Sequence, residues 1–393
     1  MALSRVCRPS QHRTERPITS IPARATFVYR GQLHVELSRI QFLLAAVCAT
    51  FGEVDAVLLS PGSGATADEF EAFARQFPNV RTCSFVPAGR TSQMAARRRV
   101  ATLVAPDAAT IVAVGFSAAA FLPDRRCLVW CVNGIPEERL LHRRTLAQRL
   151  AVWLAWRAAK RLRAQCTVVV SQPMADLMEH RVGGRQFVVP NAVDLSVFEP
   201  STGDKPVYLT YQGGGSPWQG LDRLALVWRE LYAIAPHLRF RVITTDPRAH
   251  VLAEGLPNEA VEIGSTHDPR EMAAMLGESR LGFLFRAPDV VNEVSWPMKL
   301  GEYLAAGTPV VVTRCGWDAE RLIEQHAAGL VVDWDASPAD TARRIAEYVE
   351  LLDGERPAGL ATAAAALSAS LWGPALQAEM TAVASGSRER VES

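Results

Sequence analysis

Several features are scarce or missing in this sequence, and each absence excludes a class of protein. No apolar run reaches the roughly 18 uncharged residues that a bilayer-spanning helix needs, so no transmembrane helix is predicted. The seven cysteines are odd in number and lack paired spacing, which argues against a disulfide framework and favours reduced thiols in a cytoplasmic protein. No group of cysteines and histidines has the spacing of a zinc site. Lysine is rare, with three residues against 39 arginines.

The first 24 residues carry five arginines but no apolar core, so they do not resemble a secretory signal. We expect residues 1–24 to form a flexible basic tail. A transit peptide and a misassigned start site are the alternatives.

The remaining composition is that of a soluble globular protein, with 49% apolar and 21% charged residues. A chain of 393 residues is long enough for two to three domains. Its charge is divided unevenly. Residues 1–200 hold 25 Lys and Arg against 15 Asp and Glu, whereas residues 201–393 hold 17 against 26. This asymmetry favours two domains, with any anionic partner on the first.

Short apolar runs alternate with amphipathic stretches along both halves, which predicts strands separated by helices. Strands joined by helices form parallel sheets covered on both faces. We therefore expect an α/β protein with two Rossmann-like, doubly wound domains facing a central cleft. The predicted divisions are a first domain over 25–197, a Pro/Gly/Ser-rich linker over 198–205, a second domain over 206–364 and a C-terminal helix and tail over 365–393. The predicted strands cover 25–29, 55–59, 81–85, 110–114, 127–132, 166–170, 187–189, 207–211, 240–244, 261–263, 281–285, 309–312 and 330–332.

The most informative stretch is FLFRAPDVVNEVSWPMKLGEYLAAG, residues 283–307. An apolar strand is followed by a loop and then by a helix, which Ser295 can cap and in which Pro297 suits the first turn. The N-terminus of such a helix attracts anions. The positive end of the helix dipole disfavours a lysine in the first turn, so Lys299 suggests a bound anion that offsets its charge. Glu302 lies on the same face of the helix, and its carboxylate is suited to accepting hydrogen bonds from a pair of vicinal hydroxyls. The alternative is a solvated pair between Lys299 and Glu302.

This stretch resembles the nucleotide-sugar signature of the family-four, or group 1, retaining glycosyltransferases. One branch of that family carries S-x-P-x-K-x-x-E-Y-L-A-x-G, which residues 295–307 match. The segment VVPNAVDLSVFEP at 188–200 resembles the family's V-I-P-N-G-V-D-x-x-x-F-x-P at the domain junction. The segment YQGGGSPWQGLDRL at 211–224 is similar to the strand, glycine loop and helix that open the family's second domain. The three motifs occur in the family's order.

The resemblance implies a GT-B fold and a nucleotide-diphosphate sugar donor bound mainly by the second domain. It implies that Glu302 binds the ribose and that backbone N–H groups of the glycine loop approach the diphosphate, since a side chain would block them. Asn191 and Asp194 correspond to the hinge region, with a purely local role as the alternative. The donor-binding residues expected on this basis are Gly213, Gly214, Gly215, Ser295, Pro297, Lys299, Glu302 and Tyr303.

The sequence departs from the family at three places. The arginine and lysine that usually clamp the diphosphate are missing, and their places fall near 214–216 and at Gln219. The first member of the usual acidic pair is displaced, because Glu293 stands one residue early. We expect Arg286 and Lys299 to replace the lost clamp through charge-assisted bonds. The alternative for Arg286 is an ordinary arginine at a strand end. Glu293, Lys299 and Arg286 are accordingly the candidate catalytic residues.

Acceptor-side candidates follow two strands of the first domain. They are Arg30 and Gly31 after the first strand, and Asn133 after the fifth, where many relatives have histidine. An amide can position a hydroxyl but is not a strong base. For Asn133 the alternative is a turn residue before Gly134. Retaining transfer in this fold is usually proposed to need no protein base, because the donor phosphate accepts the proton.

A basic segment over 136–165 contains eight Arg and Lys against two Glu, together with Trp153 and Trp156. A basic amphipathic helix with tryptophan can lie on anionic lipid. The alternative is a helix packed on the core with a solvated basic face. No motif for nucleic acid is present.

These observations predict a retaining glycosyltransferase that moves a sugar to a hydroxyl of a glycan, a lipid-linked glycan or a small glycoside. A non-catalytic relative that binds a glycan or a partner glycosyltransferase is one alternative, and a sugar-nucleotide hydrolase or epimerase is another. We expect no cofactor and no metal requirement. Asp333 and Asp335 have a metal-binding spacing, but they lie in a loop between a predicted strand and helix. The expected location is the cytoplasm, with peripheral attachment to the inner membrane face as an option.

Overall fold

The computed structural model describes residues 24–31, 33–62, 66–89, 92–104, 110–122, 126–200, 207–352 and 355–386. The predicted tail, apart from Arg24, lies outside these ranges, and so do residues 201–205 of the predicted linker.

The first domain is built on a parallel sheet of seven strands in the order β3-β2-β1-β4-β5-β6-β7. Every strand from 25 to 189 that the sequence predicts is present, so the α/β assignment is confirmed for this half. The strands are β1 (Arg24–Tyr29), β2 (Glu53–Ser60), β3 (Val80–Pro87), β4 (Ile111–Val114), β5 (Arg126–Val132), β6 (Arg163–Val169) and β7 (Gln186–Val188). The helical segments are α1 (Leu33–Thr50), α2 (Ala67–Ala74), α3 (Gln93–Leu103), η1 (Phe116–Ala120), α4 (Glu138–His142), α5 (Leu146–Ala159) and α6 (Gln172–Arg181).

The second domain repeats this plan with a six-stranded parallel sheet in the order β10-β9-β8-β11-β12-β13. Its strands are β8 (Tyr208–Gln212), β9 (Arg239–Ile243), β10 (Val261–Gly264), β11 (Ser279–Leu284), β12 (Val310–Arg314) and β13 (Gly329–Asp333). Its helical segments are η3 (Pro217–Gln219), α7 (Leu221–Ile234), η4 (Pro247–Ala253), η5 (Asn258–Ala260), α8 (Pro269–Gly277), α9 (Val290–Glu293), α10 (Met298–Ala305), α11 (Asp318–His326) and α12 (Pro338–Leu352). Helices α13 (Leu360–Ala365) and α14 (Ala369–Ala384) complete the chain.

Both sheets are doubly wound, because the strand order reverses once in each. The reversal falls between β1 and β4 in the first sheet and between β8 and β11 in the second. The central strands β4 and β12 are apolar runs that are buried almost throughout, as expected for strands with helices on both faces. Ligands of such sheets bind beyond the carboxyl ends of the strands at the point of reversal. The fold therefore marks β1/β4 and β8/β11 as the places to look for a site.

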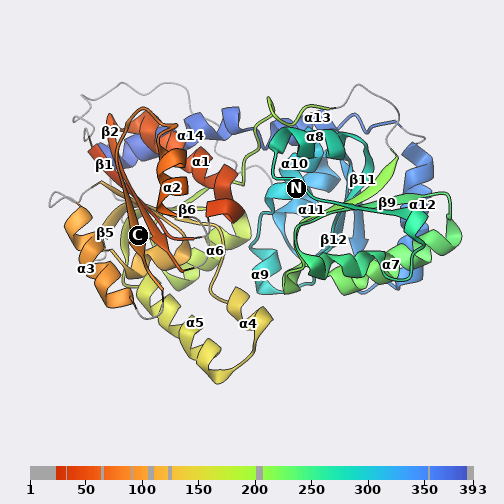
Figure 1. The fold of residues 1–393 in the computed structure, drawn as a ribbon, viewed down its shortest axis with the longest axis horizontal. Coiled ribbons are helices and arrows are strands. Elements are labelled where there is room, and N and C mark those ends of the chain that lie inside the picture. Colours follow the sequence, from red (N-terminus) through yellow and green to blue (C-terminus); the bar gives the residue numbers. More distant parts are fainter. Residues whose placement is uncertain are drawn as a thin grey trace.

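The last helix crosses back from the second domain to the first, where α14 packs along α1 (Figure 1). Arg185 forms an ion pair of 2.6 Å with Glu379, whose side chain is buried, and Gln377 donates a hydrogen bond of 2.7 Å to the Ala49 carbonyl. The predicted C-terminal helix thus belongs structurally to the first domain.

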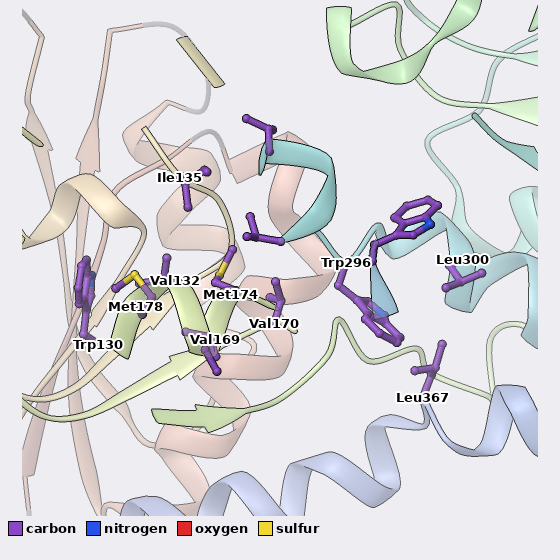
Figure 2. Close-up of a cluster of buried hydrophobic side chains, with 14 of the residues drawn as sticks. Trp130, Val132, Ile135, Val169, Val170, Met174, Met178, Trp296, Leu300 and Leu367 are labelled. Carbon is purple, nitrogen blue, oxygen red and sulfur yellow. The ribbon is translucent and has the colours of Figure 1, made fainter. Parts of the chain in front are cut away.

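The two domains share one continuous apolar core. A cluster of buried side chains runs from Trp130 and Met174 of the first domain to Trp296 and Leu300 of the second (Figure 2). Polar contacts reinforce it: the Ser171 hydroxyl donates to the Val294 carbonyl at 2.7 Å, and the Asn191 amide donates to the Trp296 carbonyl. The hinge-region Asn191 therefore links the domains directly.

The basic segment 136–165 contains two helices, α4 and α5, and the beginning of β6 at Arg163. One local prediction is wrong. Helix α10 starts at Met298 with Pro297 in the capping position, and Ser295 does not cap it, because the Ser295 hydroxyl donates to the Asn292 carbonyl at 2.8 Å. Within the described ranges, no helix combines the length and the apolar character needed to cross a bilayer.

Candidate functional site

A cavity of about 130 Å³ lies between the two domains. The loop after β5, helix α4 and Met174 line it from the first domain, whereas Trp218 and the segment around α9 line it from the second. Four of the predicted site residues line this cavity: Asn133 of the first domain, and Arg286, Ser295 and Pro297 of the stretch 283–307. The structure therefore places the predicted acceptor side and donor side against a common space.

Residues predicted to bind the donor lie at the strand reversal of the second sheet. Gly213 follows β8, and Arg286 follows β11, which is the neighbour of β8 in the sheet. The backbone of Gly213 has φ of +125°, and a Cβ atom there would lie 2.5 Å from the Lys299 Nζ. The backbone conformation therefore favours glycine, and a side chain at this position would displace the end of the Lys299 side chain.

Lys299 is partly buried and points at the glycine loop instead of at solvent. Its Nζ donates a hydrogen bond of 3.1 Å to Gln219 Oε1 and lies 4.6 Å from the ring centroid of Tyr211. Burial, together with the charge of Arg286, lowers the pKa of Lys299 well below its usual value. Gln219 is the residue at which the resemblance predicts a clamp lysine, and the Lys299 ammonium group lies within hydrogen-bonding distance of it.

Arg286 is a second cation of this region, and its side chain is 5% exposed. Its Nη1 donates to Asn292 Oδ1 at 2.9 Å, while Nε is buried without a hydrogen-bond partner. Burial lowers the pKa of Arg286 as well. Among the residues that the structure describes, neither Arg286 nor Lys299 forms an ion pair with a carboxylate. Buried cations left in this state favour an anionic ligand, because burying an unpaired charge is costly.

Glu302 is one turn beyond Lys299 on α10 and is also partly buried. Its Oε2 accepts a hydrogen bond of 2.6 Å from the Gln212 amide at the end of β8. Burial raises the pKa of Glu302, and the Gln212 bond and the charge of Lys299 counteract part of that rise. The alternative of a solvated surface pair is therefore wrong, because both side chains are partly buried and each is hydrogen-bonded to another residue of the second domain. Neither of them lines the cavity.

The glycine loop differs from expectation in its hydrogen bonding. The Gly213 N–H donates to the Ile243 carbonyl at 2.9 Å, and the Gly215 N–H donates to Asp246 Oδ2 at 2.8 Å. Arg248 binds the same carboxylate, and these contacts hold the pKa of Asp246 well below its usual range. Two of the three N–H groups expected at the diphosphate are therefore already occupied.

Tyr303 lies in the core, although it was expected on the donor face. Its side chain is fully buried. Its hydroxyl donates a hydrogen bond to the Thr210 carbonyl at 3.1 Å and accepts one from the Gln212 N–H at 2.8 Å. A Cβ atom at Gly282 would lie 2.6 Å from the tyrosine ring. Tyr303 thus fixes α10 against β8 and keeps Gln212 in place.

The other predicted residues are more dispersed. Glu293 is exposed at the end of α9, beside Gly316. Arg30 is held in the first domain, where Nη1 donates to Ser117 Oγ at 2.5 Å and the guanidinium lies 5.0 Å from the Phe121 ring centroid. Arg30 and Gly31 follow β1 but are not among the residues lining the cavity. Asn133 alone of the acceptor candidates reaches it.

Sequence reasoning missed four contributors to the site. Gln212 is the last residue of β8 and Asp246 lies just after β9, and this position at a strand end was the only signal available for them. Glu138 and Trp218 line the cavity from opposite domains. His142 on α4 packs edge-on against Trp218, with ring centroids 5.4 Å apart. Contacts of this kind across a domain boundary have no counterpart in local sequence.

Comparison with known proteins identifies the second domain. Residues 206–350 match the family model described as "Glycosyl transferases group 1". This part of the chain is therefore a group 1 glycosyl transferase domain, which confirms the resemblance found in its motifs. No curated protein sequence matches the chain.

Solved structures match over nearly the whole chain. Sucrose-phosphate synthase from Thermosynechococcus elongatus superposes with a TM-score of 0.65 and 14% identity, covering 91% of this chain and 97% of its own. HepE from Anabaena, solved in complex with UDP-glucose, gives a TM-score of 0.66 at 18% identity, with 91% and 99% covered. A glycosyltransferase from Rickettsia africae gives 0.61 at 13% identity, with 92% and 98% covered. The predicted GT-B fold, with its two parallel-sheet domains, is thereby confirmed.

Proposed function

We propose that this protein is a retaining glycosyltransferase that uses a nucleotide-diphosphate sugar. One observation carries the proposal: the buried Arg286 and the partly buried Lys299 lie near each other at the strand reversal of the second sheet, and among the described residues neither forms an ion pair with a carboxylate. A diphosphate would supply the missing negative charge. The group 1 family match of this domain supports the same conclusion.

The expected chemistry follows from the placement of these groups. As the bond between the anomeric carbon and the diphosphate breaks, negative charge grows on the departing phosphate, where Lys299 and Arg286 can stabilise it. The acceptor oxygen bonds to the anomeric carbon on the same face, and its proton passes to the departing phosphate oxygen. Glu302 is placed to accept hydrogen bonds from ribose hydroxyls. The acceptor is a hydroxyl of a glycan, a lipid-linked glycan or a small glycoside, bound against Asn133 in the first domain.

We further propose that transfer needs neither metal nor cofactor, because two protein cations already face the donor side. Donor binding and turnover should then be unchanged by a chelator. We place the protein in the cytoplasm, in keeping with six cysteines that remain free thiols among the described residues.

A non-catalytic role is the second candidate. It is favoured by the glycine loop, whose Gly213 and Gly215 N–H groups are occupied by Ile243 and Asp246. Such a relative would bind a nucleotide or glycan without turning it over.

A thermal-shift screen separates these candidates. The protein is heated with uridine, guanosine, adenosine and thymidine diphosphate sugars, and the best donor is then incubated with and without sugar acceptors. Stabilisation followed by acceptor-dependent release of nucleoside diphosphate supports the transferase. Release without any acceptor indicates hydrolysis, and stabilisation without release indicates the binding protein. The transferase proposal fails if no donor stabilises the protein.

A further inference from the structure

Helix α5 exposes an apolar stripe that the fold does not use. Four large side chains on this helix are solvent-exposed: Leu146 by 83%, Leu150 by 56%, Trp153 by 53% and Leu154 by 51%. Their spacing of four, three and one residues puts them on one face of the helix. In Figure 1, α4 and α5 project beyond the sheet at the lower edge of the first domain.

The opposite face of α5 anchors the helix to the protein. Val152, Trp156 and Ala159 are buried there, and the Trp156 indole N–H donates to Glu137 at 2.8 Å. The two tryptophans of the basic segment therefore have different roles, since Trp156 belongs to the core and Trp153 to the surface. The exposed stripe contributes little to folding, and an exposed cluster of this kind indicates a binding surface.

The residues on and next to α5 in the sequence carry only positive charge. The span 143–163 contains no Asp or Glu and seven exposed cations, which are Arg143, Arg144, Arg149, Arg157, Lys160, Arg161 and Arg163. The Arg157 guanidinium lies 5.2 Å from the Trp153 ring centroid, so charge and aromatic surface are presented together. This combination is typical of helices that lie in the interface of an anionic membrane.

We propose that this α5 surface, the apolar stripe with its seven cations, docks on an anionic lipid bilayer. The surface is close to the proposed site, because α4 precedes α5 directly, Glu138 of α4 lines the cavity, and His142 of α4 contacts Trp218. Docking would bring a lipid-linked acceptor to the cavity. That last consequence rests on the proposed transferase function, whereas docking itself does not.

The test is sedimentation with vesicles of phosphatidylcholine, alone or mixed with phosphatidylglycerol. We expect the wild type to bind only the anionic vesicles, with binding that weakens as salt is added. The double variant Leu150→Glu/Trp153→Glu should bind at least tenfold more weakly, and Arg149→Gln/Arg157→Gln should lose the preference for anionic lipid. Leu351→Glu is the matched control, because Leu351 is 80% exposed at the end of α12, away from this surface, and it should bind like the wild type.

Three results would overturn the docking proposal. One is a wild type that does not bind anionic vesicles, and another is an equal loss of binding in Leu351→Glu. The third is a dimer in sedimentation velocity without lipid that Leu150→Glu/Trp153→Glu dissociates, since a second copy of the chain would then cover the stripe. Nucleotide binding measured by calorimetry on the same variants keeps the two proposals apart. If the wild type binds no nucleotide, the transferase proposal is refuted, but the docking proposal is not.

Discussion

Replacing Lys299 by methionine should stabilise the free protein while weakening its donor binding. The side chains are similar in length, but methionine carries no charge. Because the pKa of Lys299 is lowered mainly by burial, the charged form disfavours the folded state of the free protein. Removing a buried charge that lacks a carboxylate partner should gain about 1 kcal/mol or more. For a domain of this size, that corresponds to a rise of roughly 2–4 °C in Tm.

The same substitution removes a charge-assisted bond to the proposed diphosphate. Such a bond contributes about 1.5–3 kcal/mol, so the Kd for the best nucleoside diphosphate should increase by roughly 10- to 150-fold. Differential scanning fluorimetry gives Tm, and isothermal titration calorimetry gives Kd. A higher Tm together with a lost ligand-induced shift is the expected result.

Arg270→Met is the matched control, because Arg270 is exposed on α8 and does not line the cavity. It should change neither Tm nor Kd appreciably. The reasoning is refuted if Lys299→Met binds nucleoside diphosphate like the wild type. It is equally refuted if the Tm of Lys299→Met is lower than that of the wild type, since Lys299 would then stabilise the folded protein in the absence of an anion.

Three further predictions concern the same region. Glu302→Gln should weaken nucleoside diphosphate binding about tenfold, and it should abolish the preference for ribose over deoxyribose ligands in competition calorimetry. The affinity should decline as pH rises through the lowered pKa of Lys299, because the bound anion favours the protonated amine and a proton must then be taken up on binding. Lys299→Arg should retain its affinity to higher pH in the same titration, and identical pH profiles would exclude this assignment. Tyr303→Phe should cost about 1–3 kcal/mol of unfolding free energy in urea, because the hydroxyl bonds both Thr210 and Gln212.

Local residue patterns predicted the elements but not all of their ends. The strands predicted over 55–59 and 127–132 lie within β2 and β5, because an apolar run is a property of neighbouring residues. The composition of the basic segment 136–165 did not show where its helices end, and the structure ends α4 at Arg143, which adopts an extended conformation. The prediction that Ser295 caps the following helix is wrong for a related reason. The short helix α9 brings Ser295 within hydrogen-bonding distance of the Asn292 carbonyl, which accepts a bond from the Ser295 hydroxyl.

The sequence alone determined that this chain forms two parallel α/β sheets and that residues 295–307 carry the donor motif. Alternating apolar runs and a contiguous motif consist of residues that are neighbours in the sequence, so they can be recognised without any tertiary contact. Only the tertiary structure decided that Lys299 reaches Gln219, that Gln212 binds Glu302, that Tyr303 is core and that Glu138 faces Trp218. These pairings depend on which strands become neighbours at the reversal of a sheet and on how two domains close, and those are set by packing over long sequence distances.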